Sequence, residues 1–191
     1  MGCNIQQLPM KFNAHIKAIY LVNSAGAKMQ SAISAKLIAG IGIEGDRYAM
    51  GTGAYSATEP AKVRHISLIS LSGIETANEW LKAGDEPTFD AAETRRNIAL
   101  EGITAAELNG LVGKRFQLGD IQMLGTELCT PCERPAQLLS RPSFMDAFEG
   151  RGGIRAEVLS SGILAIGDQL STEKEKWLNT ARTPLLLLSK R

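Results

Sequence analysis

The stretch His65-Ile66-Ser67-Leu68-Ile69-Ser70-Leu71 carries the clearest fold signal in the sequence. Its apolar residues largely alternate with polar ones, and this period of two is typical of a β-strand. The next segment changes character, because Ser72 is followed three residues later by Glu75, the pattern of a helix capping box. We therefore expect a strand at 65–71 that leads directly into a helix over about 73–82.

Other short runs predict more strands and a few short helices. Further strands are expected at 15–23, 35–39, 114–118, 121–124, 154–159 and 163–166. Within this set, the runs on either side of Gly119-Asp120 predict a β-hairpin, and the last two predict a strand pair around Ser160-Ser161-Gly162. Short helices are expected at 104–109, 134–139 and 144–148. The first of them begins at a second capping box, Thr104 with Glu107.

These strands and inserted helices do not alternate regularly, so a doubly wound parallel sheet is disfavoured. The 19 glycines fit the many tight turns of a β-rich domain. We therefore predict a mainly β fold, a closed or nearly closed β-barrel with a few short inserted helices. Its expected extent is residues 16–170, with a lead-in at 1–15 and a tail at 171–191.

The composition argues against several broad functions. A chain of 191 residues, 44% of them hydrophobic and 21% charged, can fold as one domain without disulfide or metal staples. The net charge of +1 argues against broad binding of nucleic acid or of an anionic membrane, and no apolar run is long enough to span a bilayer. The chain has 3 cysteines, and two of them form one CxxC, so a disulfide framework is not expected. No secretory signal is expected either, and a reducing cytoplasm is the expected location.

The segment Glu127-Leu128-Cys129-Thr130-Pro131-Cys132 is the candidate centre of any chemistry. Zinc is not expected, because one CxxC supplies two of the four ligands of a structural site. A thioredoxin-like redox pair fits the local pattern but lacks the surrounding β-α-β unit, and two buried, inert thiols are a third interpretation. A fourth follows from the helix expected at 134–139. A cysteine at its N-terminus, beside Arg134, would be a reactive thiol able to bind a soft metal or carry a sulfane sulfur.

Arginines form a second constellation. Several lie beside glycines or before expected strands, where backbone amides can also point at a ligand, and arginine suits bidentate recognition of phosphate. The residues concerned are Arg47, Arg64, Arg95, Arg96, Arg151 and Arg155, with Asn97 directly after Arg96. The sequence contains neither a GxxxxGK phosphate loop nor a GxGxxG fingerprint, so nucleotide binding is not predicted.

The acidic and histidine residues are less informative. Asp46 and Asp168 each follow a glycine and are interpreted as turn residues, whereas Glu127 is near enough to Cys132 in sequence to orient a ligand. His65 is expected to be a core or lining residue of its strand, and no Ser-His-Asp hydrolase motif is present.

Several motifs, taken in order along the chain, resemble those of one known family. They are Gly42-Ile43-Glu44-Gly45-Asp46-Arg47, Arg95-Arg96-Asn97-Ile98 with the downstream Gly102, Leu108, Gly110, Leu111 and Gly113, then Gly119-Asp120, Pro131-Cys132, Gly150-Arg151-Gly152-Gly153-Ile154-Arg155-Ala156 and Gly167-Asp168. This pattern is similar to that of the MOSC domain, named for the C-terminal domain of molybdenum cofactor sulfurase. Each motif is weak alone, but their order and spacing from about residue 16 to about residue 170 make the likeness specific.

The resemblance implies a β-barrel and places the family's characteristic cysteine at Cys132. In related proteins this cysteine ligates molybdenum held by a pyranopterin dithiolene, and in others the domain is thought to carry sulfur for transfer. Cys132 would then be both the catalytic thiol and the molybdenum ligand. The side chains implied to hold the pterin and its phosphate are Arg47, Arg95, Arg96, Asn97, Arg151 and Arg155.

Two departures limit what the resemblance implies. Sulfurases have a pyridoxal-phosphate domain that generates the sulfur, and a chain of this length has no room for it. Reductases of N-hydroxylated compounds work with other domains or electron partners, and this sequence has no ferredoxin-like cysteine set. The expected protein is therefore a molybdenum-dependent oxidoreductase or a sulfur transferase. It would take electrons from a partner protein, or sulfur from a donor such as a cysteine desulfurase. The alternatives are a thiol–disulfide redox protein that uses Cys129 and Cys132, and a non-enzymatic module that binds an anion.

Overall fold

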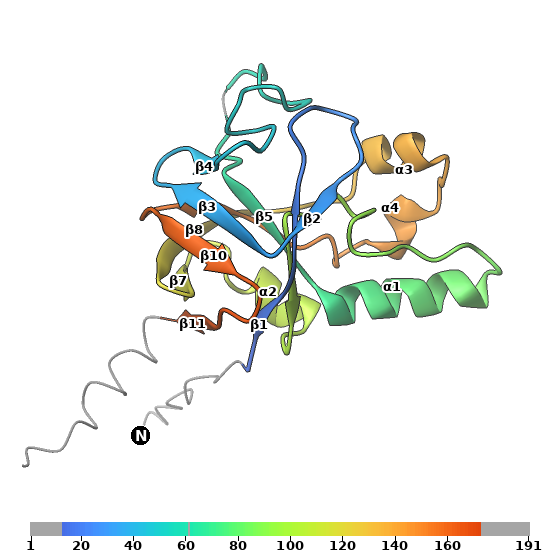
Figure 1. Cartoon of the computed structure of the whole chain (residues 1–191). Coiled ribbons are helices and arrows are strands. Elements are labelled where there is room, and N and C mark those ends of the chain that lie inside the picture. Colours follow the sequence, from blue (N-terminus) through green and yellow to red (C-terminus); the bar gives the residue numbers. More distant parts are fainter. Residues whose placement is uncertain (1–12, 61, 173–191) are drawn as a thin grey trace, which may run out of the picture.

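Short strands dominate the computed structural model of the chain (Figure 1), which describes residues 13–60 and 62–172. The strands are β1 (His15–Leu21), β2 (Gln30–Ala32), β3 (Ser34–Ile38), β4 (Gly42–Ile43), β5 (Ile66–Ser70), β6 (Ile98–Glu101), β7 (Arg115–Leu118), β8 (Ile121–Leu128), β9 (Ile154–Val158), β10 (Gly162–Ala165) and β11 (Leu170–Thr172). The helices are α1 (Leu71–Ala83), α2 (Ala105–Asn109), α3 (Glu133–Leu139) and α4 (Phe144–Ala147).

Eight of these strands form one curled sheet in the order β11-β7-β8-β9-β5-β6-β1-β2, and β10-β3-β4 form a second, smaller sheet. The large sheet curls until strands near its two ends meet. The amide of Leu170 donates to the carbonyl of Ala14 at 2.8 Å, and the amide of Ile16 donates to that of Asp168 at 2.9 Å. The result is an open barrel, and the prediction of a mainly β, nearly closed barrel with a few short helices is confirmed.

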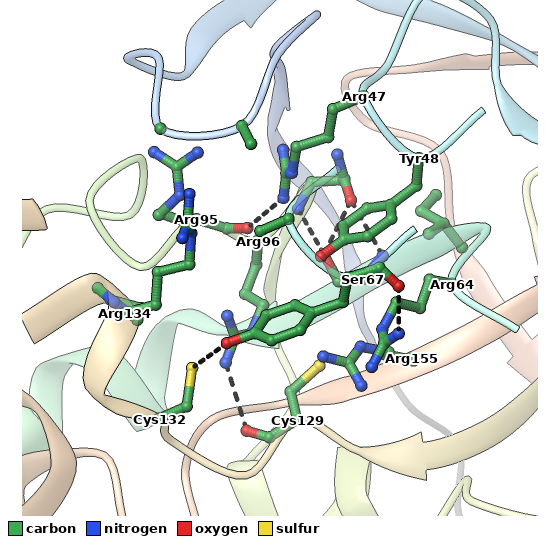
Figure 2. A pocket seen from close by; sticks show the side chains of 17 residues that line it. Arg47, Tyr48, Arg64, Ser67, Arg95, Arg96, Cys129, Cys132, Arg134 and Arg155 are labelled. Carbon is green, nitrogen blue, oxygen red and sulfur yellow. Dashed lines mark hydrogen bonds between the residues drawn. The ribbon is translucent and has the colours of Figure 1, made fainter. Parts of the chain in front are cut away.

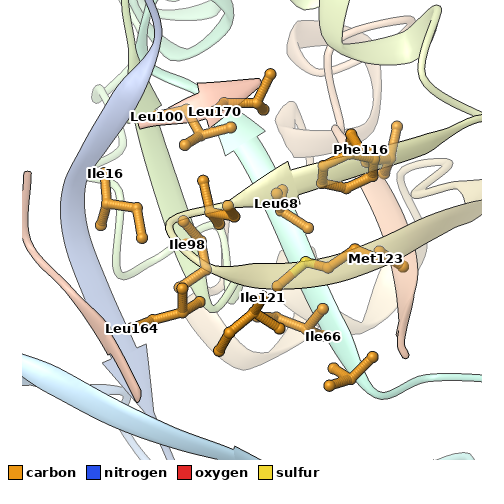
Figure 3. Close-up of a cluster of buried hydrophobic side chains, with 14 of the residues drawn as sticks. Ile16, Ile66, Leu68, Ile98, Leu100, Phe116, Ile121, Met123, Leu164 and Leu170 are labelled. Carbon is orange, nitrogen blue, oxygen red and sulfur yellow. The ribbon is translucent and has the colours of Figure 1, made fainter. Parts of the chain in front are cut away.

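Strand β5 explains why the barrel has two apolar layers. Ile66 and Leu68 point into the barrel and join its central core, which Figure 3 shows in close-up. Ile69 points the other way and packs in a second cluster with residues of α1, α3 and α4, the helices that Figure 1 shows together on one side of the barrel. Because side chains alternate along a strand, one short segment anchors both layers.

Helix α1 follows β5 as predicted, but it begins earlier than the capping-box pattern indicated. Ser70, not Ser72, is the N-cap, and its hydroxyl accepts a hydrogen bond from the amide of Gly73 at 2.9 Å. Ser72 instead donates to the carbonyl of Ile103, at 3.2 Å. The prediction of a Ser72–Glu75 box was therefore wrong, whereas the Thr104–Glu107 box at the start of α2 is confirmed.

The predicted pairing of the last two strands was also wrong. Strands β9 and β10 both form, but β9 pairs with β8 and β5, and β10 pairs with β3 in the smaller sheet. The turn between them directs the chain away from β9. Ser160 accepts from the amide of Gln122 at 2.9 Å, and Ser161 accepts from the amide of Ala39 at 3.0 Å. The two serines thus attach the turn to the start of β8 and to the end of β3.

Gly152 and Gly153 allow three backbone segments to meet at the start of β9. A Cβ on Gly152 would overlap the carbonyl of Cys129, and one on Gly153 would overlap the carbonyl of Leu68. Gly153 also has φ of +82°, a left-handed conformation that side chains other than glycine rarely adopt. The amide of Cys129 donates to the carbonyl of Gly153 at 2.8 Å, so this close approach positions the cysteine segment.

The predicted extent of the domain, residues 16–170, stays a prediction. Strand β1 begins at His15 and β11 ends at Thr172, while most of the expected lead-in and tail lies outside the described residues. Within the described ranges, no helix combines the length and apolar character that crossing a bilayer requires.

We predict that Gly153→Ala lowers the free energy of unfolding by about 3 kcal/mol or more, because the added methyl group overlaps the Leu68 carbonyl in a left-handed position. The matched control is Gly167→Ala. Gly167 has φ of +93° but open space around it, so only the backbone cost of about 1 kcal/mol applies. Urea unfolding of both variants tests this, and equal losses would contradict the packing explanation.

Candidate functional site

A pocket beside the cysteine segment gathers most of the predicted site residues (Figure 2). Its cavity volume is about 70 Å³. Its walls are formed by Ala25, Gly26, Arg47, Tyr48, Ala54, Tyr55, Arg64, Ile66, Ser67, Arg95, Arg96, Asn97, Cys129, Cys132, Arg134, Pro135 and Arg155. These residues come from the turn between β1 and β2, the Gly-rich loop, the start of β5, the segment before β6, the segment from β8 to α3, and β9. The pocket thus forms where distant parts of the chain converge.

Cys132 is the exposed thiol of this pocket and the N-cap residue of α3. The helix predicted at 134–139 is therefore confirmed, and the thiol stands at its N-terminus. The hydroxyl of Tyr55 donates to Cys132 Sγ at 3.9 Å, the dashed line to Cys132 in Figure 2. Burial raises the pKa of Tyr55, and its hydrogen bond to Cys132 raises it further. The phenol therefore keeps its proton as a donor toward the sulfur.

Cys129 differs from Cys132, because its side chain is buried. In Figure 2 its sulfur lies on the Arg155 side of the pocket, away from the sulfur of Cys132. Although burial lowers the pKa of Arg155, nearby Cys129 and Glu127 raise it by more. Glu127 forms ion pairs with both Arg155 and Lys62. Glu127, five residues before Cys132 in the sequence, is therefore not one of the lining residues. It forms an ion pair with Arg155, which is.

Arg96 supports the cysteine segment from beneath. Its Nε donates to the carbonyl of Gly152 at 2.7 Å, and its two terminal nitrogens donate to Thr94 O at 2.9 Å and Cys129 O at 3.3 Å. These bonds tie the segment before β6 to the cysteine segment and to the start of β9. Arg96 therefore shapes the pocket through backbone carbonyls.

Arg47 and Arg95 bring positive charge close together. Arg47 is buried beside Asp46, with Nη1 and Oδ2 3.5 Å apart, and its Nη2 donates to the carbonyl of Arg95 at 3.2 Å. Arg95 has φ of +61°, a left-handed conformation that costs about 1–2 kcal/mol in a residue with a side chain. Burial lowers the pKa of Arg95, and the neighbouring charges of Arg47 and Arg134 lower it further. The site thus holds Arg95 in a strained backbone conformation and an unfavourable electrostatic environment.

Arg134 and Arg64 complete the ring of cations. The side chain of Arg134 makes no hydrogen bond or ion pair with any residue that the structure describes. It lies in the first turn of α3, where a positive charge is unfavourable. Arg64 lies over the ring of Tyr55 at 5.1 Å, and its buried Nε has no hydrogen-bond partner. A buried donor without a protein partner is rare, and this one is free to donate to a water or a ligand atom.

Asn97 lines the pocket, but its side chain is committed to the protein. Its Nδ2 donates to Asp46 Oδ2 at 3.1 Å and to the carbonyl of Tyr20 at 3.2 Å, and its Oδ1 accepts from the amide and hydroxyl of Ser67. Asp46 also accepts from the amide of Val22, at 3.3 Å. The interpretation of Asp46 as a simple turn residue was therefore incomplete, because its buried carboxylate joins the Gly-rich loop to the sheet.

Arg151 is the one predicted cofactor-binding residue that the structure does not bring into the pocket. Its guanidinium donates to the carbonyls of Ala147, at 3.1 Å, and Glu149, at 3.3 Å, at the end of α4. Tyr48, Tyr55 and Ser67 are lining residues that the sequence reasoning missed. The tyrosines follow the GDR motif in the Gly-rich loop, and an aromatic side chain in such a loop is the one signal that could have revealed them.

The pocket is suited to an anion. Six arginines line it, and the described residues of its lining include no carboxylate and no lysine. Arginine binds oxyanions and phosphate with paired hydrogen bonds, and Cys132 adds a sulfur nucleophile or soft-metal ligand at the same place. Among the residues described here, no group of three or more His, Cys, Asp and Glu side chains is placed to hold a metal ion. A metal at this pocket would therefore depend on sulfur or oxygen atoms of a bound ligand.

Comparison with known proteins defines the class. Residues 47–171 match the MOSC domain family, and the chain belongs to that family. The YuaD protein from Bacillus subtilis has a similar structure, with a TM-score of 0.68, 20% identity, and coverage of 82% of this chain and 93% of that one. YiiM from Geobacillus stearothermophilus has a TM-score of 0.60 at 14% identity, covering 84% of this chain and 75% of its own. YiiM from Escherichia coli has a TM-score of 0.57 at 17% identity, covering 86% and 70%. No curated protein is significantly similar in sequence. The MOSC family is linked to binding of molybdenum cofactor or to sulfur transfer.

We predict that Arg134→Gln stabilises the ligand-free protein by about 0.5 kcal/mol at low ionic strength, because it removes an unpaired cation from a helix N-terminus near Arg95. The gain should shrink in 0.5 M NaCl, which screens the repulsion. Urea unfolding at the two salt concentrations measures it. Arg115→Gln, an exposed substitution in β7, is the control and should change nothing. A destabilising effect of Arg134→Gln would contradict this account.

Proposed function

We propose that this MOSC protein binds molybdenum cofactor at the pocket, with Cys132 as the ligand of the molybdenum. The observation that carries the proposal is the ring of six arginines around one exposed thiol, without a carboxylate in the lining. Four of the six, Arg64, Arg95, Arg96 and Arg134, form no ion pair with a described residue, and one singly charged ligand does not account for so many cations. A ligand that carries both a phosphate and an anionic sulfur–metal centre does, because each charged end requires its own donors.

The residues present fit such a ligand by their chemistry. Arg64 has a buried Nε without a hydrogen-bond partner, and the side chain of Arg134 makes no hydrogen bond or ion pair with the described residues. Both guanidinium groups can therefore donate to acceptor atoms of a ligand. Arg95, whose pKa is lowered by burial and neighbouring cations, would gain from a nearby anion. Arg96 and Asn97, in contrast, would act by shaping the pocket, because their polar atoms already bond to the protein.

The size of the pocket limits how the ligand is seated. A cavity of about 70 Å³ accepts a group the size of a phosphate or a metal-bound sulfur, so the remainder of a pterin would extend through the mouth. When bound, the cofactor supplies molybdenum redox chemistry, and reduction of N-hydroxylated compounds is the reaction class that we propose. Cys132 would hold the metal, the tyrosine hydroxyl of Tyr55 would donate to its sulfur, and electrons would come from a partner protein.

A sulfur carrier is the second candidate, favoured by the exposure of Cys132 and by the small cavity. A persulfide on Cys132 would occupy the pocket, its anionic sulfur facing the arginines, after transfer from a donor such as a cysteine desulfurase. Pyridoxal phosphate, a group associated with the sulfurases, is not supported here, because no described residue of the lining is a lysine that could form a Schiff base. A Cys129–Cys132 redox pair is less well supported, because the two sulfur atoms point to different sides of the pocket.

Native purification, followed by elemental analysis for molybdenum and cyanolysis for sulfane sulfur, tests these proposals. We expect bound molybdenum in the wild type and a loss of at least about tenfold in Cys132→Ser, because the ligand to the metal is gone. Cys129→Ser and the remote Arg115→Gln should keep most of it.

Sulfane sulfur on Cys132 without molybdenum would replace the first candidate by the second. A reversible disulfide, with Cys129→Ser as harmful as Cys132→Ser, would favour the redox pair. If the wild type holds neither molybdenum nor sulfane sulfur, and Cys132→Ser matches it, the proposal is wrong.

A further inference from the structure

A second pocket lies next to the first, on the other side of a wall formed by Tyr48, Tyr55 and Arg64. These three residues line both cavities, and Arg64 lies over the two tyrosine rings at 6.0 and 5.1 Å. The second cavity is larger, with a volume of about 320 Å³, within the usual range of small-molecule sites. The residues that line it are Gly40, Ile41, Tyr48, Ala49, Gly51, Tyr55, Ser56, Lys62, Arg64 and His65.

The lining of this second pocket is rich in hydrogen-bond donors. Lys62 and Arg64 are cationic, and Ser56 supplies a hydroxyl. The ring of His65 accepts a hydrogen bond at Nδ1 from the amide of Val158, at 3.2 Å, so its proton is on Nε2 and that nitrogen is a donor. Burial lowers the pKa of His65 by more than the charge of Glu157 raises it. The neutral form of the ring therefore dominates near neutral pH. No carboxylate is among the described residues of this lining, so its cationic donors face no anionic acceptor there.

The charge around the pocket comes from three cations, Lys62, Arg64 and Arg155, and from two carboxylates, Glu127 and Glu157. The carboxylate of Glu127 pairs with Lys62 at 3.0 Å and also with Arg155, so one negative charge is shared by two cations. Arg64 adds a third positive charge, and it forms no ion pair with a described residue. Its Nη1 donates to the carbonyl of Tyr55 at 3.2 Å and to the hydroxyl of Thr58 at 3.4 Å. An anion in the pocket would offset this excess.

The lining suits a planar compound. Tyr48, Tyr55 and Ile41 contribute aromatic and apolar carbon to it, so a flat ring can pack beside them while an attached anionic group meets the donors. The pocket is also adjacent to Cys132, because Tyr55 lines it and donates to Cys132 Sγ at 3.9 Å. A compound held here would therefore be one side chain away from the proposed working thiol.

We infer that the second pocket is the substrate site, and that it takes a small planar organic anion, such as an aromatic carboxylate, beside Cys132. The assignment of this pocket as a substrate site rests on the proposed function, whereas the binding of the anion does not. Tyr55, between the two cavities, is the residue that a bound compound must contact to reach the sulfur.

The test is a titration of the ¹⁵N-labelled protein with sodium benzoate, followed by amide chemical shifts at constant ionic strength. Benzamide, the neutral compound of the same shape, is the matched ligand. We expect saturable shifts at Ile41, Gly51 and His65, with benzamide at least about tenfold weaker because it lacks the charge.

Three variants sharpen the test. Ala49→Phe fills the pocket and should abolish the benzoate shifts, and Lys62→Gln should weaken binding several-fold. Lys114→Gln, an exposed substitution far along the chain before β7, should bind like the wild type. The amide spectrum of each variant shows directly whether it is folded.

Cys132→Ser separates this inference from the proposed function. Benzoate should bind this variant as it binds the wild type, whether or not Cys132 holds molybdenum. Saturable binding in a protein that shows no dependence on Cys132 for molybdenum or sulfur would refute the proposed function and keep the anion site. Equal binding of benzamide, shifts confined to Gly26 and Asn97 in the first pocket, or no effect of Ala49→Phe would each overturn the inference.

Discussion

The hydrogen bond between Asn97 and the buried carboxylate of Asp46 is the constraint on which the pocket depends. A buried carboxylate is costly unless it is paired and hydrogen-bonded, and Asp46 meets this condition through Asn97, the amide of Val22 and the charge of Arg47. Asn97 in turn accepts from Ser67, in β5. One small network therefore joins the Gly-rich loop to β1, β5 and the start of β6. The tyrosines carried by that loop are fixed over the arginines only while this network is intact.

Two arginines of the ring, Arg95 and Arg134, follow a different logic, because their placement opposes stability. Arg95 adopts a left-handed backbone conformation, its pKa is lowered by burial and by Arg47 and Arg134, and Arg134 stands at a helix N-terminus. A protein selected for stability alone has no physical reason to keep this arrangement. The strain is compensated by backbone bonds such as those of Arg96, which lock the cysteine segment to β9. This arrangement thus lowers the free energy of unfolding, and an anion that binds at the same place would raise it.

The sequence predicts well what depends on neighbouring residues and poorly what depends on distant ones. The helix after Cys132, the box at Thr104 and the barrel class were all confirmed, since capping and period-two patterns are local. The pairing of β9 with β10 was wrong, because the turn serines bond to strands far away in the chain. Short strands such as β2, β4 and β11 have too few residues to show a period. Tyr55 was missed for the same reason as the pairing, because its contact with Cys132 joins two residues that lie 77 positions apart in the sequence.

The order of strands in the large sheet has a consequence for how the protein is made. Strand β9 lies between β8 and β5, although β5 leaves the ribosome long before it, and the Gly153 turn that seats the cysteine segment is at the start of β9. Synthesis proceeds from the N-terminus, so β5 waits for a neighbour that emerges much later than it does. Until residues 152–158 have emerged, Arg155 and the contact of Arg96 with the Gly152 carbonyl are missing, so the arginine ring is incomplete. Any ligand of this pocket therefore meets the folded barrel, because the pocket is not complete before β9 joins the sheet.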